Sequence, residues 1–300
     1  MPHDHAHHHA EASDRNLAAA VAVNLTLGLA QIAGGLIAGS VALIADAVHN
    51  LSDAVTLVLA YVARRIARRP VDAAMTFGYG RAEVVAALIN YSALIVVAGW
   101  LAVEGASRLL NPPEVQGVIV VALAALALGI NLATAALTWR EAKHSMNIRA
   151  AYLHNVADAA SSVAVIAAGG LILLFGWRWV DPLATLGIAA WMLWQALHEI
   201  GPAIRILMLG APPGIAADEV LARIAAVEGV NGVHHLHLWQ IDEHDTSLEA
   251  HLVVAGDGVA VSARVRAMLD ESFGIHHATL AVETAGAACE KRQAIGCAAE

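Results

Sequence analysis

Six long apolar stretches are the feature that most limits how this chain can fold. Each has about the 20 residues that a helix needs to cross the hydrocarbon core of a bilayer. The chain is 58% hydrophobic and 14% charged, whereas a soluble globular protein is typically about 45–50% apolar and about 25% charged. The sequence therefore predicts an all-α bundle of six transmembrane helices over residues 15–209, embedded in a lipid bilayer. The apolar stretches run over about residues 17–38, 41–63, 84–103, 117–139, 150–175 and 183–209.

Basic residues near the ends of these stretches predict the orientation of the bundle. Cytoplasmic loops of membrane proteins are enriched in Lys and Arg. With six spans, only Arg108 and Arg178 fall on one side of the membrane. We therefore expect both termini in the cytoplasm. The basic residues on that cytoplasmic side are Arg15, Arg64, Arg65, Arg68, Arg69, Arg81, Arg140, Lys143, Arg149 and Arg205.

A change of composition after Pro212 and Pro213 marks a second domain. It begins with an amphipathic helical pattern and continues with two alternating strand patterns around a polar turn, a second helix and a third strand. The order α-β-β-α-β predicts a small α+β domain over residues 212–284, which the orientation places in the cytoplasm. The patterns cover residues 216–227, 232–241, 246–254, 259–273 and 278–283.

The two ends of the chain differ in composition from both domains. Residues 1–14 contain five histidines and form a His-rich N-terminal arm that we expect in the cytoplasm. A His-rich arm either collects metal ions or is a weakly binding or irrelevant tail. Residues 285–300 are rich in Ala and Gly and are expected to be a flexible tail. Its cysteines, Cys289 and Cys297, lack the C-x-x-C spacing of a metal motif, and we interpret them as incidental.

One short motif occurs twice inside the apolar stretches. His49 and Asp53 lie four residues apart, as do His154 and Asp158. Residues at this spacing share one face of a helix. Ionisable side chains at membrane depth are costly and commonly mark the path of an ion.

Two such helix faces turned toward each other offer two imidazoles and two carboxylates, a tetrahedral ligand set for a divalent metal such as Zn²⁺. The two carboxylates neutralise the ion, which limits the cost of burying it. Two polar helix-packing pairs without a metal are the alternative, which we disfavour because carboxylates at this depth are expensive without a cation. Asp46 shares the same face, and we interpret it as an outer partner that orients His49 or as a structural residue, rather than as a direct ligand.

These segments resemble the signatures of a known family. Residues 40–54, from Ser40 to Ala54, resemble the second-helix signature of the cation diffusion facilitator family. The segment from His154 to Asp158 is similar to its fifth-helix signature, and residues 77–83 are similar to the start of its third helix. The resemblance covers nearly the whole chain.

The resemblance implies a homodimeric zinc–proton antiporter that exports metal from the cytoplasm across a bacterial cytoplasmic membrane. It also implies that the C-terminal domain is ferredoxin-like. His49, rather than an aspartate, stands at the first position of the second-helix motif, as in the zinc-selective branch of the family. The expected partners are zinc ions, protons, lipid and a second copy of the chain, and no nucleic acid.

The family's cytoplasmic zinc sites imply a second metal site in the C-terminal domain. The best candidates by this similarity are His234, His251, His276 and Glu283. Zn²⁺ bound there would be structural or regulatory. On a regular strand His235 and His237 share one face and His234 lies on the other. Several of these histidines could equally be ordinary polar residues on the strand surface. Arg264 and Arg266 stand where some members of the family place a bridging His, so we do not expect a binuclear site.

Other function classes fit the sequence less well. An intramembrane zinc protease would need an H-E-x-x-H helix and an open coordination position. His198-Glu199 is followed by Ile-Gly-Pro, and we therefore expect no enzyme. A zinc-binding membrane sensor or scaffold without transport stays open, as does antiport with Co²⁺, Ni²⁺ or Cd²⁺ as the main substrate.

Overall fold

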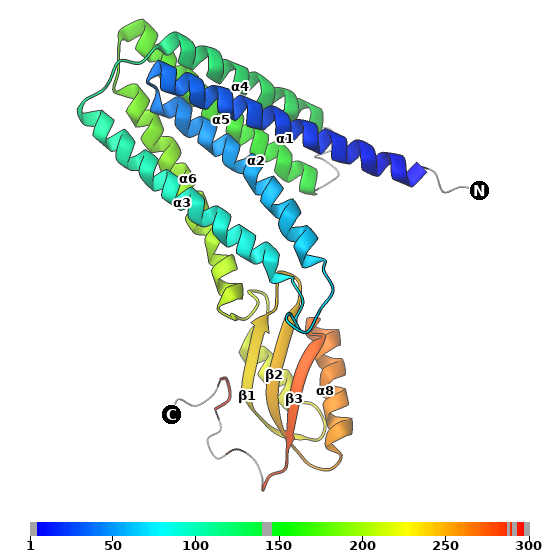
Figure 1. Cartoon of the computed structure of the whole chain (residues 1–300). Helices are drawn as coiled ribbons and strands as arrows, with labels where there is room; N and C mark the ends of the chain where they lie inside the picture. Colours follow the sequence, from blue (N-terminus) through cyan, green and yellow to red (C-terminus); the bar gives the residue numbers. More distant parts are fainter. Residues whose placement is uncertain (1–4, 140–145, 287–288, 290–292, 297–300) are drawn as a thin grey trace. The chain divides into compact units, whose positions relative to one another are not determined.

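The computed structural model describes residues 5–139, 146–286, 289 and 293–296, and the side chains of residues 5–21, 138, 146–148 and 150–151 are not part of that description. The chain forms two compact units (Figure 1). The first unit comprises Met1–Tyr61 and Ile89–His198. The second comprises Val62–Leu88 and Glu199–Glu300, so it includes the C-terminal domain and the adjoining ends of three long helices.

Helices form at all six positions where the apolar stretches predict them (Figure 1). Among the described residues, α2, α3, α4 and α5 contain segments that are long and apolar enough to cross a membrane. In α1 the apolar segment within the described side chains is shorter, Ala22–Ala38. The helices are α1 (His5–Ala38), α2 (Val41–Ala67), α3 (Arg81–Leu110), α4 (Gly117–Thr138), α5 (Met146–Phe175) and α6 (Val180–Leu207).

Many large apolar side chains lie on the surface of these helices. Small side chains such as Ala45, Ala98 and Ala124 are fully buried in the core of the first unit, where they allow close packing of helices. Leu137 and Leu174 are 81% and 77% exposed. Water disfavours large apolar side chains so exposed, whereas lipid tails accommodate them. The first unit is therefore built for a lipid environment.

A buried carboxylate ties the start of α2 to α6. Ser40 precedes α2, and its hydroxyl accepts a hydrogen bond from the backbone N–H of Leu43 at 3.1 Å, which is a helix N-cap. The same hydroxyl donates to Asp181 of α6. Asp181 also accepts from the backbone N–H of Val41 at 3.0 Å.

We expect Asp181→Ala to lower the free energy of unfolding by about 2–3 kcal/mol, because it leaves buried donors at the start of α2 without their acceptor. The measurement is thermal unfolding of the purified protein in detergent. Glu114→Ala is the control, since Glu114 forms an exposed ion pair with Arg178 at 2.7 Å and such pairs contribute about 0–1 kcal/mol. Equal stability of the two variants would contradict this role of Asp181.

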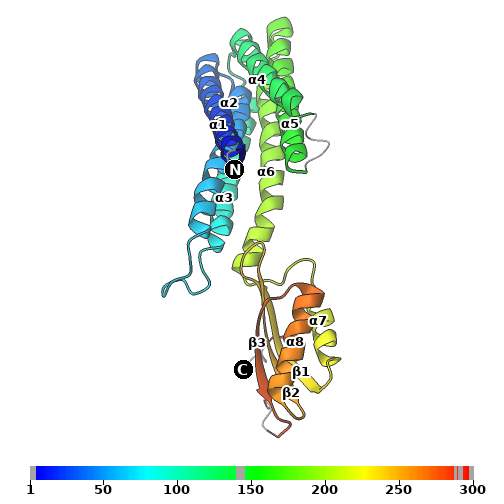
Figure 2. The same cartoon turned by 90° about the vertical axis from the view of Figure 1, so that its right-hand side faces the viewer.

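The C-terminal domain has the predicted order of elements. They are α7 (Ala217–Ala225), β1 (Val230–Gln240), β2 (Thr246–Val254), α8 (Gly258–Phe273) and β3 (His277–Glu283). The sheet has the order β1-β2-β3, with β1 antiparallel and β3 parallel to β2. Figure 2 shows α7 and α8 on the same side of this sheet. Ile224 of α7 and Leu269 of α8 share a buried core with Leu248 and Leu252 of β2.

The alternation along β2 assigns the two faces of the sheet. Leu248 and Leu252 face the helices, so His251 lies on the opposite face. His251 pairs with His234 of β1, and Glu249 pairs with His237. Three steps along β1 therefore match two along β2, which is a β-bulge with one extra residue.

The bulge corrects the expected faces of the β1 histidines. His235 has φ of 53°, in the left-handed region, and it is one of the two residues that lie between the paired positions. His234 and His237 both pair with residues of the face that carries His251, so these two share a face. The prediction that His235 and His237 share one face and that His234 lies on the other was wrong, because a regular strand alternation does not include the extra residue of the bulge.

Part of the segment predicted as a flexible tail contacts β1 at this bulge. The backbone N–H of His235 donates to the carbonyl of Gln293 at 2.8 Å, and that of Leu236 donates to Ala294 at 3.1 Å. The N–H of Gly296 donates back to the carbonyl of Leu236 at 3.0 Å. Residues 293–296 thus pair with β1 at the edge of the sheet.

Candidate metal sites

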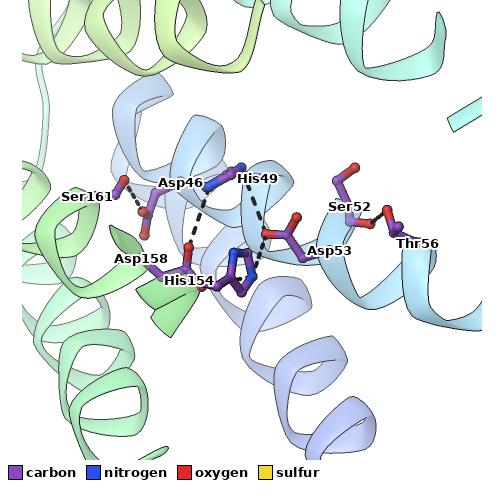
Figure 3. Close-up of polar contacts among 8 residues, drawn as sticks. All are labelled: Asp46, His49, Ser52, Asp53, Thr56, His154, Asp158 and Ser161. Atoms are coloured by element: carbon purple, nitrogen blue, oxygen red, sulfur yellow. Dashed lines mark hydrogen bonds and ion pairs between the residues drawn. The ribbon is translucent and has the colours of Figure 1, made fainter. Parts of the chain in front are cut away.

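The structure brings the two repeated motifs together within the first unit (Figure 3). His49 and Asp53 come from α2, and His154 and Asp158 come from α5. The Nε2 atom of His49 lies 3.5 Å from Oδ1 of Asp158, and Nε2 of His154 lies 3.5 Å from Oδ2 of Asp53. Each imidazole thus reaches the carboxylate of the other helix.

Contacts within each helix complete the group. His49 Nδ1 lies 3.9 Å from Asp53 Oδ2, and His154 Nε2 lies 3.5 Å from Asp158 Oδ2. Bonds of about 2.0–2.2 Å from a tetrahedral zinc ion place neighbouring ligand atoms roughly 3.3–3.6 Å apart. The separations between imidazole and carboxylate across the two helices match this geometry.

The four side chains differ in burial. His49 and Asp158 are 9% and 8% exposed, whereas the His154 side chain is 42% exposed. The ligand atoms of His49, Asp53 and Asp158 all lie within 4.8 Å of one another. His154 contacts both carboxylates from the more open side of this group. The arrangement therefore has three converging ligand atoms and one side chain at its accessible edge.

Asp46 lies close to this group but has other partners (Figure 3). It is fully buried, and it accepts hydrogen bonds from Gln31 Nε2 of α1 at 2.9 Å and from Ser161 Oγ of α5 at 2.7 Å. Asp46 therefore connects α1, α2 and α5. These hydrogen bonds are structural contacts, one of the two roles expected for Asp46, and an effect on His49 stays a prediction.

Three of the four residues expected at the cytoplasmic site come together in the second unit. The Oε2 atom of Glu283 lies 3.2 Å from His234 Nε2, and its Oε1 atom lies 2.7 Å from His251 Nδ1. His276 lies elsewhere, with its Nδ1 atom 2.7 Å from Asp270 and its side chain 74% exposed. The structure thus groups His234, His251 and Glu283 and separates His276 from them.

Two residues that sequence reasoning did not select complete this cluster. The ligand atoms of His234, His235, His251 and Cys289 lie within 4.8 Å of one another. His235 joins the cluster because of the β-bulge. Cys289, which we interpreted as incidental, contacts Glu283 and His251. The density of His in β1 could have suggested His235, but no spacing rule in the sequence links Cys289 to β2 and β3.

The environment of Glu283 keeps it ionised. Burial opposes ionisation of this carboxyl, but hydrogen bonds from His251 and Cys289 outweigh it and hold the pKa of Glu283 below its ordinary value. A carboxylate in this state is ready to bind a cation.

Cys297 and His3 lie outside the described residues, as do the side chains of His5, His7, His8 and His9.

Comparisons with known proteins agree with this architecture. A cation efflux transmembrane domain matches residues 17–208, and the cytoplasmic domain of cation efflux proteins matches residues 212–285. The chain is 33% identical to a cadmium, cobalt and zinc/H(+)-K(+) antiporter of Bacillus velezensis, over 94% of this chain and 92% of that protein.

Two further relatives are similar over comparable lengths. The chain is 34% identical to the metal cation efflux system protein CzcD of Cupriavidus metallidurans, over 97% of this chain and 92% of that protein. It is 30% identical to the zinc transporter ZitB of Escherichia coli, over 94% and 93%. Since the family match covers both domains and its members are transporters rather than enzymes, this chain is a multi-pass membrane protein of the cation diffusion facilitator family.

Proposed function

We propose that this protein exports Zn²⁺ from the bacterial cytoplasm in exchange for external protons, by alternating access around a site formed by His49, Asp53, His154 and Asp158. The observation that carries the proposal is the meeting of two His–Asp pairs from α2 and α5 within an apolar helical unit. The relatives named as zinc transporters and as a proton-coupled antiporter support the same cargo and coupling ion.

The chemistry of the four side chains suits zinc and proton exchange. Two imidazole nitrogens and two carboxylate oxygens are the donor types that zinc accepts, and two carboxylates neutralise the ion. Metal binding requires deprotonated ligands. Protons at an acidic outer face therefore compete with the metal for His49 and His154. The same groups, once protonated, carry protons inward.

The proposed topology has six spans, both termini in the cytoplasm and a location in the cytoplasmic membrane. Six long helices and the one-sided distribution of Arg and Lys support it. The C-terminal domain, with its two helices on one side of a three-stranded sheet, would be ferredoxin-like and hold two subunits together as a homodimer. Its match to the family's cytoplasmic domain supports this role.

Cytosolic zinc would also bind to His234, His251 and Glu283 and regulate transport. Binding there favours one arrangement of the C-terminal domain, and any coupling to the membrane site is reciprocal in free energy. The close approach of both imidazoles to one ionised carboxylate supports this second site.

We expect His251→Ala to weaken zinc binding to the C-terminal domain by at least about 10-fold, a loss that even outer-shell partners of metal ligands cause. His276→Ala is the matched comparison and should leave the affinity unchanged, because His276 contacts Asp270 outside the cluster. The measurement is zinc titration by calorimetry in an Asp158→Asn background, which removes a ligand of the membrane site. An equal loss of zinc affinity in both variants would show that His276 also binds the metal.

The decisive test is zinc uptake into proteoliposomes with an acidic interior. Uptake that depends on the pH gradient and is absent from empty liposomes is the expected result. Zinc binding without any flux would instead indicate a sensor or scaffold. Competition by Co²⁺, Ni²⁺ and Cd²⁺ in the same assay ranks the substrates, and stronger transport of one of these ions would overturn the assignment of zinc.

A further inference from the structure

The thiol of Cys289 points into the cytoplasmic cluster. Its Sγ atom lies 3.3 Å from Oε1 of Glu283 and 3.8 Å from Nδ1 of His251. Glu283 in turn contacts His234 and His251 at 3.2 Å and 2.7 Å. One carboxylate therefore lies within contact distance of two imidazoles and one thiol, which come from β1, β2 and the C-terminal segment. Only 3% of His234 is exposed, so this side of the cluster is shielded from solvent.

Glu283, His234, His251 and Cys289 supply four donors for a metal ion, and His235, whose ligand atom lies within 4.8 Å of those of His234, His251 and Cys289, lies beside them. Metal bonds of about 2.0–2.3 Å place tetrahedral neighbours roughly 3.3–3.8 Å apart. The separations of 3.2, 3.3 and 3.8 Å lie at or near this range, whereas the 2.7 Å contact between His251 and Glu283 is a hydrogen bond that a bound metal would replace. The thiolate and the carboxylate together neutralise a divalent cation, whereas two imidazoles and one carboxylate would leave a charge of +1. A sulfur ligand also favours zinc and cadmium over magnesium and calcium. The fourth position at this site is therefore better filled by Cys289 than by a water molecule.

The same region of β1 binds the C-terminal segment. β1 lies at the edge of the sheet, and edge strands present backbone groups that need partners. At the bulge, the amides of His235 and Leu236 donate to Gln293 and Ala294. His234, immediately before these amides, is in the cluster, and Cys289 is four residues before Gln293. Metal binding and pairing of the segment therefore involve neighbouring residues on both partners.

From this geometry we infer that Cys289 is the fourth ligand of the cytoplasmic site and that the bound cation holds the C-terminal segment on the edge of β1. The inference rests on the cytoplasmic site of the proposed function. It adds a fourth ligand, a preference for cations that bind sulfur, and an effect of the bound cation on the C-terminal segment. A cation that binds Cys289 stabilises the paired segment, and the paired segment keeps Cys289 near Glu283, so each strengthens the other. The pairing of the C-terminal segment with β1 would then depend on whether cytosolic zinc is bound.

The first experiment is a Co²⁺ titration of the full-length protein in detergent, in the Asp158→Asn background. Cobalt bound to a thiolate gives a sulfur-to-metal charge-transfer band, and the membrane site has no sulfur ligand. We expect the band in the parent protein and its loss in Cys289→Ser, with affinity reduced at least about 10-fold. Cys297→Ser is the matched control and should keep both. A band that persists in Cys289→Ser overturns the inference.

The second experiment measures hydrogen exchange of the peptide that contains His235 and Leu236. Zinc should slow exchange of these amides in the parent protein and in Cys297→Ser, but not in Cys289→Ser. Equal protection in all three proteins would show that the segment pairs independently of the metal.

The variant His251→Ala distinguishes a failure of this inference from a failure of the cytoplasmic site itself. Metal binding that depends on His251 but gives no thiolate band leaves the cytoplasmic site standing and removes Cys289 from it. Binding that does not depend on His251 removes the site itself.

Discussion

Zinc transport is expected to fall at least about 100-fold, to the level of empty liposomes, when Asp158 is replaced by asparagine. The Asp158 side chain is 8% exposed and contacts the imidazoles of both His49 and His154 at 3.5 Å. The amide keeps the shape but removes the negative charge, so a bound zinc ion would leave a net charge of +1 at a buried site. Even outer-shell partners of a metal cost 10–100-fold in affinity, and the loss of a direct ligand should lie at or beyond that limit.

The measurement is initial zinc flux into proteoliposomes under an imposed pH gradient, with the amount of folded protein matched. Asp53→Asn should behave like Asp158→Asn, because Asp53 contacts both imidazoles as well. Glu104→Gln is the control: it also removes a carboxylate from the first unit, but Glu104 pairs with Arg108 rather than with the cluster. Wild-type flux in both aspartate variants would exclude the proposed site.

Replacement of Asp46 should separate a structural carboxylate from a metal ligand. We expect Asp46→Leu to lower the free energy of unfolding by about 2–4 kcal/mol, since Gln31 and Ser161 lose their acceptor within the helix bundle. Transport should fall with it, because α2 and α5 carry the proposed metal ligands and are held together in part by this contact. Asp46→Asn should retain most of both properties, since an amide can accept from Gln31 and donate to the Ser161 hydroxyl.

The two Asp46 variants are compared by thermal unfolding in detergent and by the same flux assay. If Asp46→Asn folds normally but loses transport as completely as Asp158→Asn, then Asp46 acts on the metal or on proton movement, and its contacts to Gln31 and Ser161 are secondary. The comparison with Asp158→Asn is informative because both changes replace a carboxyl group by an amide and preserve the side-chain shape.

Much of the membrane unit could be predicted from the sequence because its determinants are local. The apolar stretches have the length of a membrane span, and the structure has a helix at each of them. The spacing of His49 and Asp53 places both on one helix face whatever surrounds it. The approach of α2 to α5 was inferred from the chemistry of the paired motifs rather than from their spacing. The partners of Asp46 depend on α1 and α5, so residue spacing within α2 did not reveal them.

The C-terminal domain shows where local patterns stop being sufficient. Its order of helices and strands followed from periodicity. The sequence by itself determined these elements, the membrane character of the chain and its repeated His–Asp motif. Only the tertiary structure decided the composition of the cytoplasmic cluster. The bulge at His235 depends on pairing with β2, and Cys289 reaches Glu283 because the chain returns to the edge of β1. Strand register and chain return are long-range contacts, which periodicity along a single segment does not encode.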